Sequence, residues 1–204
     1  MSPTVPTASE TSERILDIAE QLVQTHGFNG FSYADIAAQL GITKASLHYH
    51  FPTKATLGER LVERYQRNFL KALADIDEGH DHALQKLKAY VRIYRDVLEA
   101  GRMCLCGMLA AEHATLPEPM RDGVRTFFAH NESWLAGVLS RGRTRSQLAF
   151  AGKPVERARF LVGALEGAML LARSHGDVER FRSSAATLLA GLAVEARPRG
   201  ARED

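Results

Sequence analysis

The spacing of apolar residues along the chain predicts helices almost throughout. Between Thr11 and His26, apolar residues recur every three or four positions, which places them on one face of a helix. Similar spacing recurs in the later segments, and no stretch shows the sustained alternation of a strand. The pattern predicts an all-α fold. The expected helices are Thr11–His26, Tyr33–Leu40, Lys44–His50, Lys54–Asp75, His82–Ala100, Arg102–Ala114, Glu118–Arg143, Val155–Ser174 and Val178–Glu195.

Capping signals mark the short helices near the N-terminus. Ser32, followed three residues later by Asp35, is typical of a capping box, and Thr43 can cap the next helix. Gly41 lies between these two helices and can take the left-handed conformation that a tight turn needs. Two short helices joined by a glycine turn predict a helix-turn-helix, with a longer helix before them.

The chain is expected to divide into two units. Residues 11–53 form an N-terminal three-helix domain with the helix-turn-helix, and residues 54–196 form a larger helical domain for ligand binding and dimerisation. Residues 1–10 and 197–204 are polar, and we expect them to be a disordered arm and tail.

Composition narrows the class of protein. The net charge of +2 over 204 residues is too small to indicate a nucleic-acid partner, so DNA binding must be argued from the motif. The N-terminus lacks a signal pattern and no run of eighteen apolar residues appears, so we expect a cytoplasmic protein without membrane contact. Cys104 and Cys106 are the only cysteines, which excludes a disulfide scaffold. If their stretch is helical, their side chains diverge by roughly 200°.

The third expected helix carries side chains suited to DNA. Hydroxyls and a helix N-terminus can bind phosphate oxygens, while lysine and histidine can reach base edges in the major groove. Lys54, at the start of the next helix, is expected to be a second phosphate anchor. The predicted DNA-binding residues are Thr43, Lys44, Ser46, His48, Tyr49, His50 and Lys54.

The N-terminal segment resembles the TetR family of bacterial one-component regulators. The resemblance covers roughly Ile15 to Leu57 and includes Leu47-His48-Tyr49-His50-Phe51-Pro52-Thr53-Lys54. Family members usually carry tyrosine at the position of His48 with histidine after it, whereas here the order is His48-Tyr49. The resemblance implies dimerisation through the last two long helices and a ligand cavity in the C-terminal core.

Small and apolar residues in the last two helices fit such a dimer interface. Glycine and alanine at three- and four-residue spacing permit close helix contact. The alternative is that both stripes are buried within one subunit. The predicted interface residues are Phe160, Gly163, Ala164, Gly167, Leu171, Leu188 and Leu192.

Aromatic and sulfur-containing side chains suggest where a ligand would bind. Such residues often line pockets, although for each residue taken singly ordinary core is the favoured interpretation. Glu112, His113, His130 and Glu166 lie among apolar residues and can either bind a ligand or face solvent. The predicted ligand-binding residues are Tyr90, Tyr94, Met103, Cys104, Met108, Phe127 and Trp134.

Cys104 is also a candidate redox sensor. Both thiols are expected near a helix N-terminus with Arg102 close by, a setting that favours thiolate. The stretch resembles the corresponding helix of thiol-reactive, N-ethylmaleimide-repressor-like members of the family. The hypothesis is that oxidation or alkylation of Cys104 releases the protein from DNA. The alternative is that both cysteines are small buried hydrophobic residues.

These patterns predict a homodimeric transcriptional repressor. It would bind a palindromic operator in double-stranded DNA and be released by an unidentified small-molecule effector or an electrophile. An activator, or a regulator controlled by a protein partner, is the alternative. An all-α enzyme is remote, because no nucleophile elbow, P-loop, dinucleotide fingerprint or zinc motif appears. We expect no cofactor and no metal, since His48 and His50 point apart on a helix.

Overall fold

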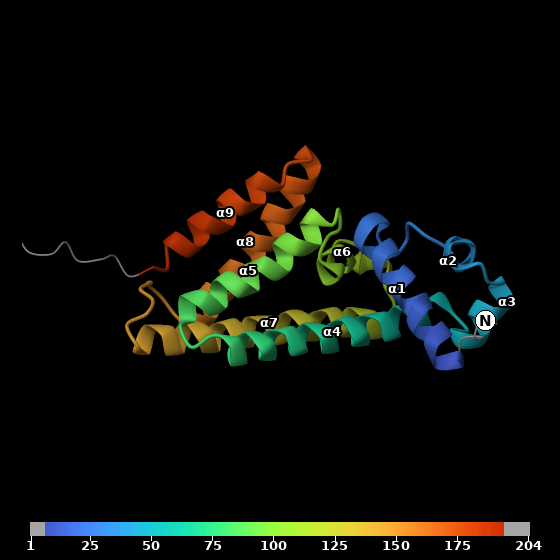
Figure 1. The fold of residues 1–204 in the computed structure, drawn as a ribbon, viewed down its shortest axis with the longest axis horizontal. Coiled ribbons are helices and arrows are strands. Elements are labelled where there is room, and N and C mark those ends of the chain that lie inside the picture. The colour runs from blue at the N-terminus through green and yellow to red at the C-terminus, as the bar shows by residue number, and fades with distance from the viewer. Residues whose placement is uncertain (1–6, 194–204) are drawn as a thin grey trace, which may run out of the picture.

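The computed structural model describes residues 7–193 and confirms the all-α fold (Figure 1). Within that range the extended pairing consists of one isolated bridge, between Leu148 and Ala193. No helix in the described part is long and apolar enough to cross a membrane. The helices are α1 Ala8–His26, α2 Tyr33–Leu40, α3 Lys44–His50, α4 Lys54–Gly79, α5 Ala83–Glu99, α6 Leu105–Ala111, α7 Glu118–Thr144, α8 Pro154–His175 and α9 Val178–Ala190, with a 3₁₀ turn at His113–Thr115.

Helix α1 begins earlier than its apolar spacing predicts. Thr7 caps the helix, because its hydroxyl accepts the Glu10 N–H at 3.2 Å while the Glu10 carboxylate accepts the Thr7 N–H at 2.7 Å. This capping box makes residues 8–10 helical, although the sequence placed them in a disordered arm. The rest of the predicted arm, residues 1–6, and the tail 197–204 lie outside the described residues.

The predicted helix Arg102–Ala114 is wrong at both ends. Gly101 adopts a φ of 72°, and the Met103 N–H donates to the carbonyl of Gln24 in α1 at 3.0 Å, so this backbone pairs with α1 and not within a helix. Cys104 is therefore the N-cap of α6 and lies outside the helix. The predicted divergence of two helical cysteines does not apply, and both thiols are free.

The helices form a small unit and a larger bundle (Figure 1). Helices α1 to α3 gather at one end, and α4 leads from them into the bundle, where it lies along α7. Helices α8 and α9 pack together, and α5 contacts both α7 and α9. The short α6 packs against α1 and α7, so it lies where the two parts meet. This position gives α6 contact with both the DNA-binding unit and the C-terminal core.

Candidate DNA-binding and effector sites

Core contacts fix the orientation of α3. Gly41 ends α2 in the left-handed conformation with a φ of 66°, and the Thr43 hydroxyl caps α3 by accepting the Ser46 N–H at 3.1 Å. Leu47 is fully buried. The buried Tyr33 hydroxyl, whose pKa burial raises to about 12, donates to the Phe51 carbonyl at 2.8 Å. The unit therefore holds α3 between two anchored ends.

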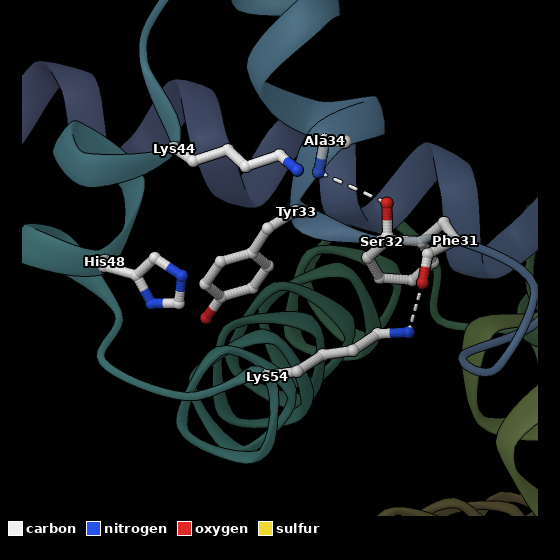
Figure 2. Close-up of a pocket in the computed structure, with 7 residues that line it drawn as sticks. All are labelled: Phe31, Ser32, Tyr33, Ala34, Lys44, His48 and Lys54. Atoms are coloured by element: carbon white, nitrogen blue, oxygen red, sulfur yellow. Dashed lines mark hydrogen bonds between the residues drawn. The ribbon is translucent and has the colours of Figure 1, made fainter.

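The outer face of α3 carries most of the predicted DNA-binding residues. Tyr49 is 79 % exposed, and Lys44 is also exposed. The His48 ring lies against Tyr33, with ring centroids 4.8 Å apart (Figure 2). Its Nδ1 atom is 3.1 Å from the Pro52 carbonyl oxygen. Both side chains are exposed, but His48 packs against Tyr33 of α2, whereas Tyr49 packs edge-on against His50 of its own helix. Thr43 is exposed as well, while Ser46 and His50 are half-buried.

Lys54 takes a different position from the one its sequence context suggested. Its ammonium donates to the Phe28 carbonyl at 2.5 Å and to the Phe31 carbonyl, and lies 4.1 Å from the centroid of the Phe31 ring. Burial lowers the pKa of Lys54, and the charges of Glu112 and Asp35 oppose that shift. Lys54 thus ties α4 to the loop between α1 and α2. A phosphate would have to compete with those two carbonyls for it.

A shallow recess of about 470 Å³ lies beside α3 (Figure 2). Lys44 reaches over it towards the N-terminus of α2, where the Ser32 hydroxyl accepts the Ala34 N–H at 3.2 Å. A cation beside a helix N-terminus suits a phosphate group. The recess is lined by Phe31, Ser32, Tyr33, Ala34, Lys44, His48 and Lys54.

Most of the predicted ligand-binding residues form a packed aromatic cluster. The rings of Tyr90, Tyr94 and Phe127 surround Phe69, at centroid distances of 6.4, 6.4 and 4.9 Å, and Trp134 stacks on Tyr90. Met103 and Cys104 are buried, and Met108 and Trp134 are partly buried. A recess of about 180 Å³ borders the cluster, but none of the seven predicted residues lines it. Its lining is Glu20, Gln24, Tyr65, Asn68, Phe69, Ala72, Ile93, Val97 and Arg102.

The Cys104 thiol is fully buried and its environment opposes ionisation. Burial, followed by the charge of Glu166, raises the pKa of Cys104 well above its ordinary value. The guanidinium of Arg102 donates to the Gln24 side chain at 3.2 Å, and Arg102 is not among the groups that shift the pKa of Cys104. The sequence-based expectation of a ready thiolate therefore conflicts with the structure, in which the thiol is protonated at neutral pH.

Glu166 is the buried carboxyl group of this core. The residue is only partly covered, yet its Oε1 atom is inaccessible to solvent and has no hydrogen-bond partner. Burial raises the pKa of Glu166 to about 7. Of the other polar residues considered as ligand hooks, His113 and His130 are exposed, and His130 pairs with Gln66 at 3.0 Å.

Glu112 joins the two parts of the molecule. Its carboxylate accepts the N–H of Phe28 at 2.7 Å and of Asn29 at 3.3 Å, so it faces the DNA-binding unit and neither a ligand nor open solvent. Arg173, from the end of α8, donates to the carbonyls of Gln24 at 3.0 Å and Thr25 at 2.6 Å. Sequence reasoning did not identify these contacts because their partners lie far apart along the chain.

Comparison with known proteins agrees with both parts of this architecture. A family model described as "Bacterial regulatory proteins, tetR family" matches residues 15–61, and one described as "Tetracyclin repressor-like, C-terminal domain" matches residues 83–188. This chain belongs to the TetR family. Its N-terminal unit is the DNA-binding domain of a TetR-family regulator.

Individual TetR-family proteins resemble the chain over most of its length. A transcriptional regulator of the family from Agrobacterium tumefaciens is 32% identical, with a TM-score of 0.89, and the match covers 92% of this chain and 100% of that one. The reduced form of E. coli NemR is 25% identical, with a TM-score of 0.79, over 91% and 99% of the two chains. The nucleoid occlusion factor SlmA of Vibrio cholerae is 26% identical over 160 residues, 77% of this chain and 81% of SlmA.

An apolar face on α8 of this TetR-family protein is left uncovered. Phe160 and Leu171 are 54% and 63% exposed, and a Cβ at Gly163 or Gly167 would face open space, with no atom within 4 Å apart from the neighbouring residues and backbone of the helix itself. Ala164 and Leu188 are partly buried. Leu192, also predicted at the interface, is instead buried within the core of its own chain.

Proposed function

We propose that this TetR-family protein is a homodimeric repressor that binds a palindromic operator through α3. The observation that carries the proposal is the exposed polar face of α3, with Tyr49 and Lys44 projecting from a unit held by buried contacts. A hydroxyl and an ammonium are suited to phosphate and base-edge acceptors. The low basic content of the unit makes a second copy necessary for tight binding.

The uncovered face of α8 supports a two-fold dimer. Large exposed apolar side chains beside glycines allow two copies of the helix to approach closely, and a symmetric pair buries the same face twice. Two α3 helices held one helical turn of DNA apart then match the two halves of a palindrome.

The short helix α6 supports release by a small molecule or an electrophile. Its N-cap is Cys104, packed in the C-terminal core, and its C-cap is Glu112, which binds the backbone of Phe28 and Asn29. A ligand or a modified thiol would displace the N-terminus of α6. Because α6 is short, its C-terminus at Glu112 would then move as well, together with the loop before α2 that Glu112 binds. The effector then favours dimers whose α3 helices no longer fit the groove.

The experiment is fluorescence anisotropy on a labelled fragment of the DNA upstream of the protein's own gene. We expect binding that the same unlabelled fragment competes and unrelated DNA of equal length does not, with an affinity that falls steeply with salt. N-ethylmaleimide added to the complex is then expected to lower the anisotropy. Equal binding to both DNAs would contradict a specific repressor.

The likeness to SlmA, which is named as a nucleoid occlusion factor, supports a second candidate function, in which the protein acts on the nucleoid as a whole and not on one promoter. Chromatin immunoprecipitation separates the two. A repressor of its own promoter gives a few peaks beside genes whose transcription rises on deletion. A nucleoid occlusion role gives many peaks and a defect in division without such changes in transcription.

A further inference from the structure

Glu166 and Cys104 come together from different helices in the C-terminal core. The carboxylate of Glu166, on α8, lies against Gly107 of α6, and a Cβ at that position would overlap its Oε2 atom, so a larger residue there would force the carboxylate to shift. The Cys104 thiol lies beside the same residue, since its Sγ atom accepts the Gly107 N–H, and after burial Glu166 is the group that acts most strongly on its pKa. The other carboxylate oxygen, Oε1, is buried and has no partner. A carboxylate with spare acceptor capacity therefore lies beside a protonated thiol.

Two hydrogen-bond donors also face the sulfur atom. The Gly107 N–H donates to Cys104 Sγ at 3.4 Å, and the Tyr65 hydroxyl lies 3.9 Å from it. These donors stabilise negative charge on the sulfur once its proton has left. The sulfur thus has donors for a developing thiolate and, in Glu166, an acceptor for the proton.

One recess ends beside the tyrosine that contacts this thiol. Tyr65, whose hydroxyl contacts Cys104, also lines the recess of about 180 Å³ between α1, α4 and α5. That volume is below the range of drug-sized pockets, so the recess suits a small reagent. The Tyr65 side chain separates the recess from the sulfur and must move for the reagent to reach it.

We infer that Glu166 is the general base that makes the buried Cys104 thiol react with small α,β-unsaturated carbonyl compounds. The inference rests on the proposed release by electrophiles and names the residue that makes that release possible. A buried thiol does not ionise on its own, so it needs a base that takes its proton during the attack.

Addition of the thiol to the unsaturated carbonyl compound needs no oxidant or other co-reactant. The thiol proton passes to the Glu166 carboxylate as the sulfur electron pair forms a bond to the β-carbon of the unsaturated carbonyl compound. The carbon–carbon π bond breaks, and its electrons form an enolate. The enolate then takes the proton from Glu166 at its α-carbon, which leaves a thioether and restores the carboxylate.

Cys106 is the matched internal control. Its thiol is also buried, and burial and Glu166 raise its pKa as well. Cys104 alone of the two has described contacts with Gly107 and Tyr65. Around Glu166 and Cys104 lie Tyr65 on α4 and Tyr90 and Tyr94 on α5, whose pKa values burial and the charges of Glu166 and Cys104 raise, and Cys106 on α6, whose charge raises the pKa of Cys104.

The test is the rate at which N-ethylmaleimide labels each cysteine of the full chain, read by mass spectrometry of the peptides. Glu166→Gln is expected to slow labelling of Cys104 at pH 7 by about 100-fold, the lower end of general-base effects. In the wild type the rate should rise with pH and level off above about 7, as Glu166 ionises. In Glu166→Gln it should rise only in the range where thiols ionise unaided.

Two comparisons keep a folding defect from imitating this result. A misfolded Glu166→Gln would expose both thiols and label Cys104 and Cys106 faster, which overturns the inference. Glu166→Asp keeps a carboxylate and should retain part of the rate and the rise near pH 7. Equal slowness of the Asp and Gln variants would show a structural effect, and would also overturn the inference.

Operator binding, measured in the same samples, separates this inference from the proposed function. Labelling of Cys104 at the wild-type rate in Glu166→Gln overturns the role of Glu166 alone. If the wild type is labelled at Cys104 but stays bound to the operator, release by electrophiles is wrong and the role of Glu166 as general base still holds. A wild type whose Cys104 is not labelled overturns both.

Discussion

The DNA-binding unit and the C-terminal core differ in whether their buried polar groups have hydrogen-bond partners. In the unit, capping boxes at Thr7 and Ser32 satisfy helix ends, and the Tyr33 hydroxyl has a partner. Among the described residues, the buried side-chain atoms without a partner all lie beyond residue 53, on Arg64, Arg121, Asn131 and Glu166. A buried polar atom without a hydrogen-bond partner lowers stability. The DNA-binding unit, whose buried polar groups have partners, therefore keeps one geometry, whereas the core becomes more stable when a ligand or a reaction supplies a missing partner.

The uncovered face of α8 gives the largest expected effect. We predict that Phe160→Glu combined with Leu171→Glu raises the dimer dissociation constant about 1000-fold, because four carboxylates would be buried together near the two-fold axis, at a cost of about 4 kcal/mol. Sedimentation velocity measures the change. The control is Lys88→Glu, an exposed charge change on α5. An unchanged dimer in the double variant would place the interface elsewhere.

Glu166 should make stability depend on pH. Its folded pKa of about 7 exceeds its ordinary 4.5, so its contribution is fully present below about pH 4.5 and is lost as the pH rises through about 7. The free energy of unfolding of the wild type should therefore fall by about 3 kcal/mol relative to Glu166→Gln across that window. Urea unfolding at a series of pH values checks this. Glu63→Gln, on an exposed carboxylate, should follow the wild type; parallel curves for Glu166→Gln would contradict the prediction.

Glu112 connects the two regions, so its loss should affect both. Glu112→Ala removes the acceptor of the Phe28 and Asn29 N–H groups and should lower the free energy of unfolding by about 2 kcal/mol. It should also reduce the loss of operator affinity caused by alkylation of Cys104. Thermal unfolding and anisotropy measure the two effects. Glu118→Ala, which breaks only exposed ion pairs, should change neither by much.

Substitutions of two tyrosines in the DNA-binding unit should have the smallest effects, one on stability and the other on DNA binding. Tyr33→Phe removes the partner of the buried Phe51 carbonyl and should lower the free energy of unfolding by about 1 kcal/mol. Tyr49→Phe removes an exposed hydroxyl and should weaken operator binding about 5-fold with stability unchanged, as the loss of one phosphate contact predicts. The reverse pattern would mean that Tyr49 does not contact DNA.

Local signals explain how much of the fold could be predicted. The bounds of α2 and α3 are those expected from Ser32, Gly41 and Thr43, since a cap and a turn act within a few residues of the chain. The Arg102–Ala114 helix failed for the opposite reason. Its first residues form a backbone hydrogen bond with α1, and no residue pattern within the segment predicts that contact.

The all-α class, the helix-turn-helix and the resemblance to the family could be predicted from the chain alone, because apolar spacing and capping residues act locally. The directions in which the charged and reactive side chains face could not be predicted in this way. Lys54 lies under Phe28 and Phe31, Glu112 binds a loop 84 residues away in sequence, and Cys104 lies in a core that keeps its thiol protonated. Burial and electrostatic environment depend on which distant segments pack together, so they follow from the folded structure alone.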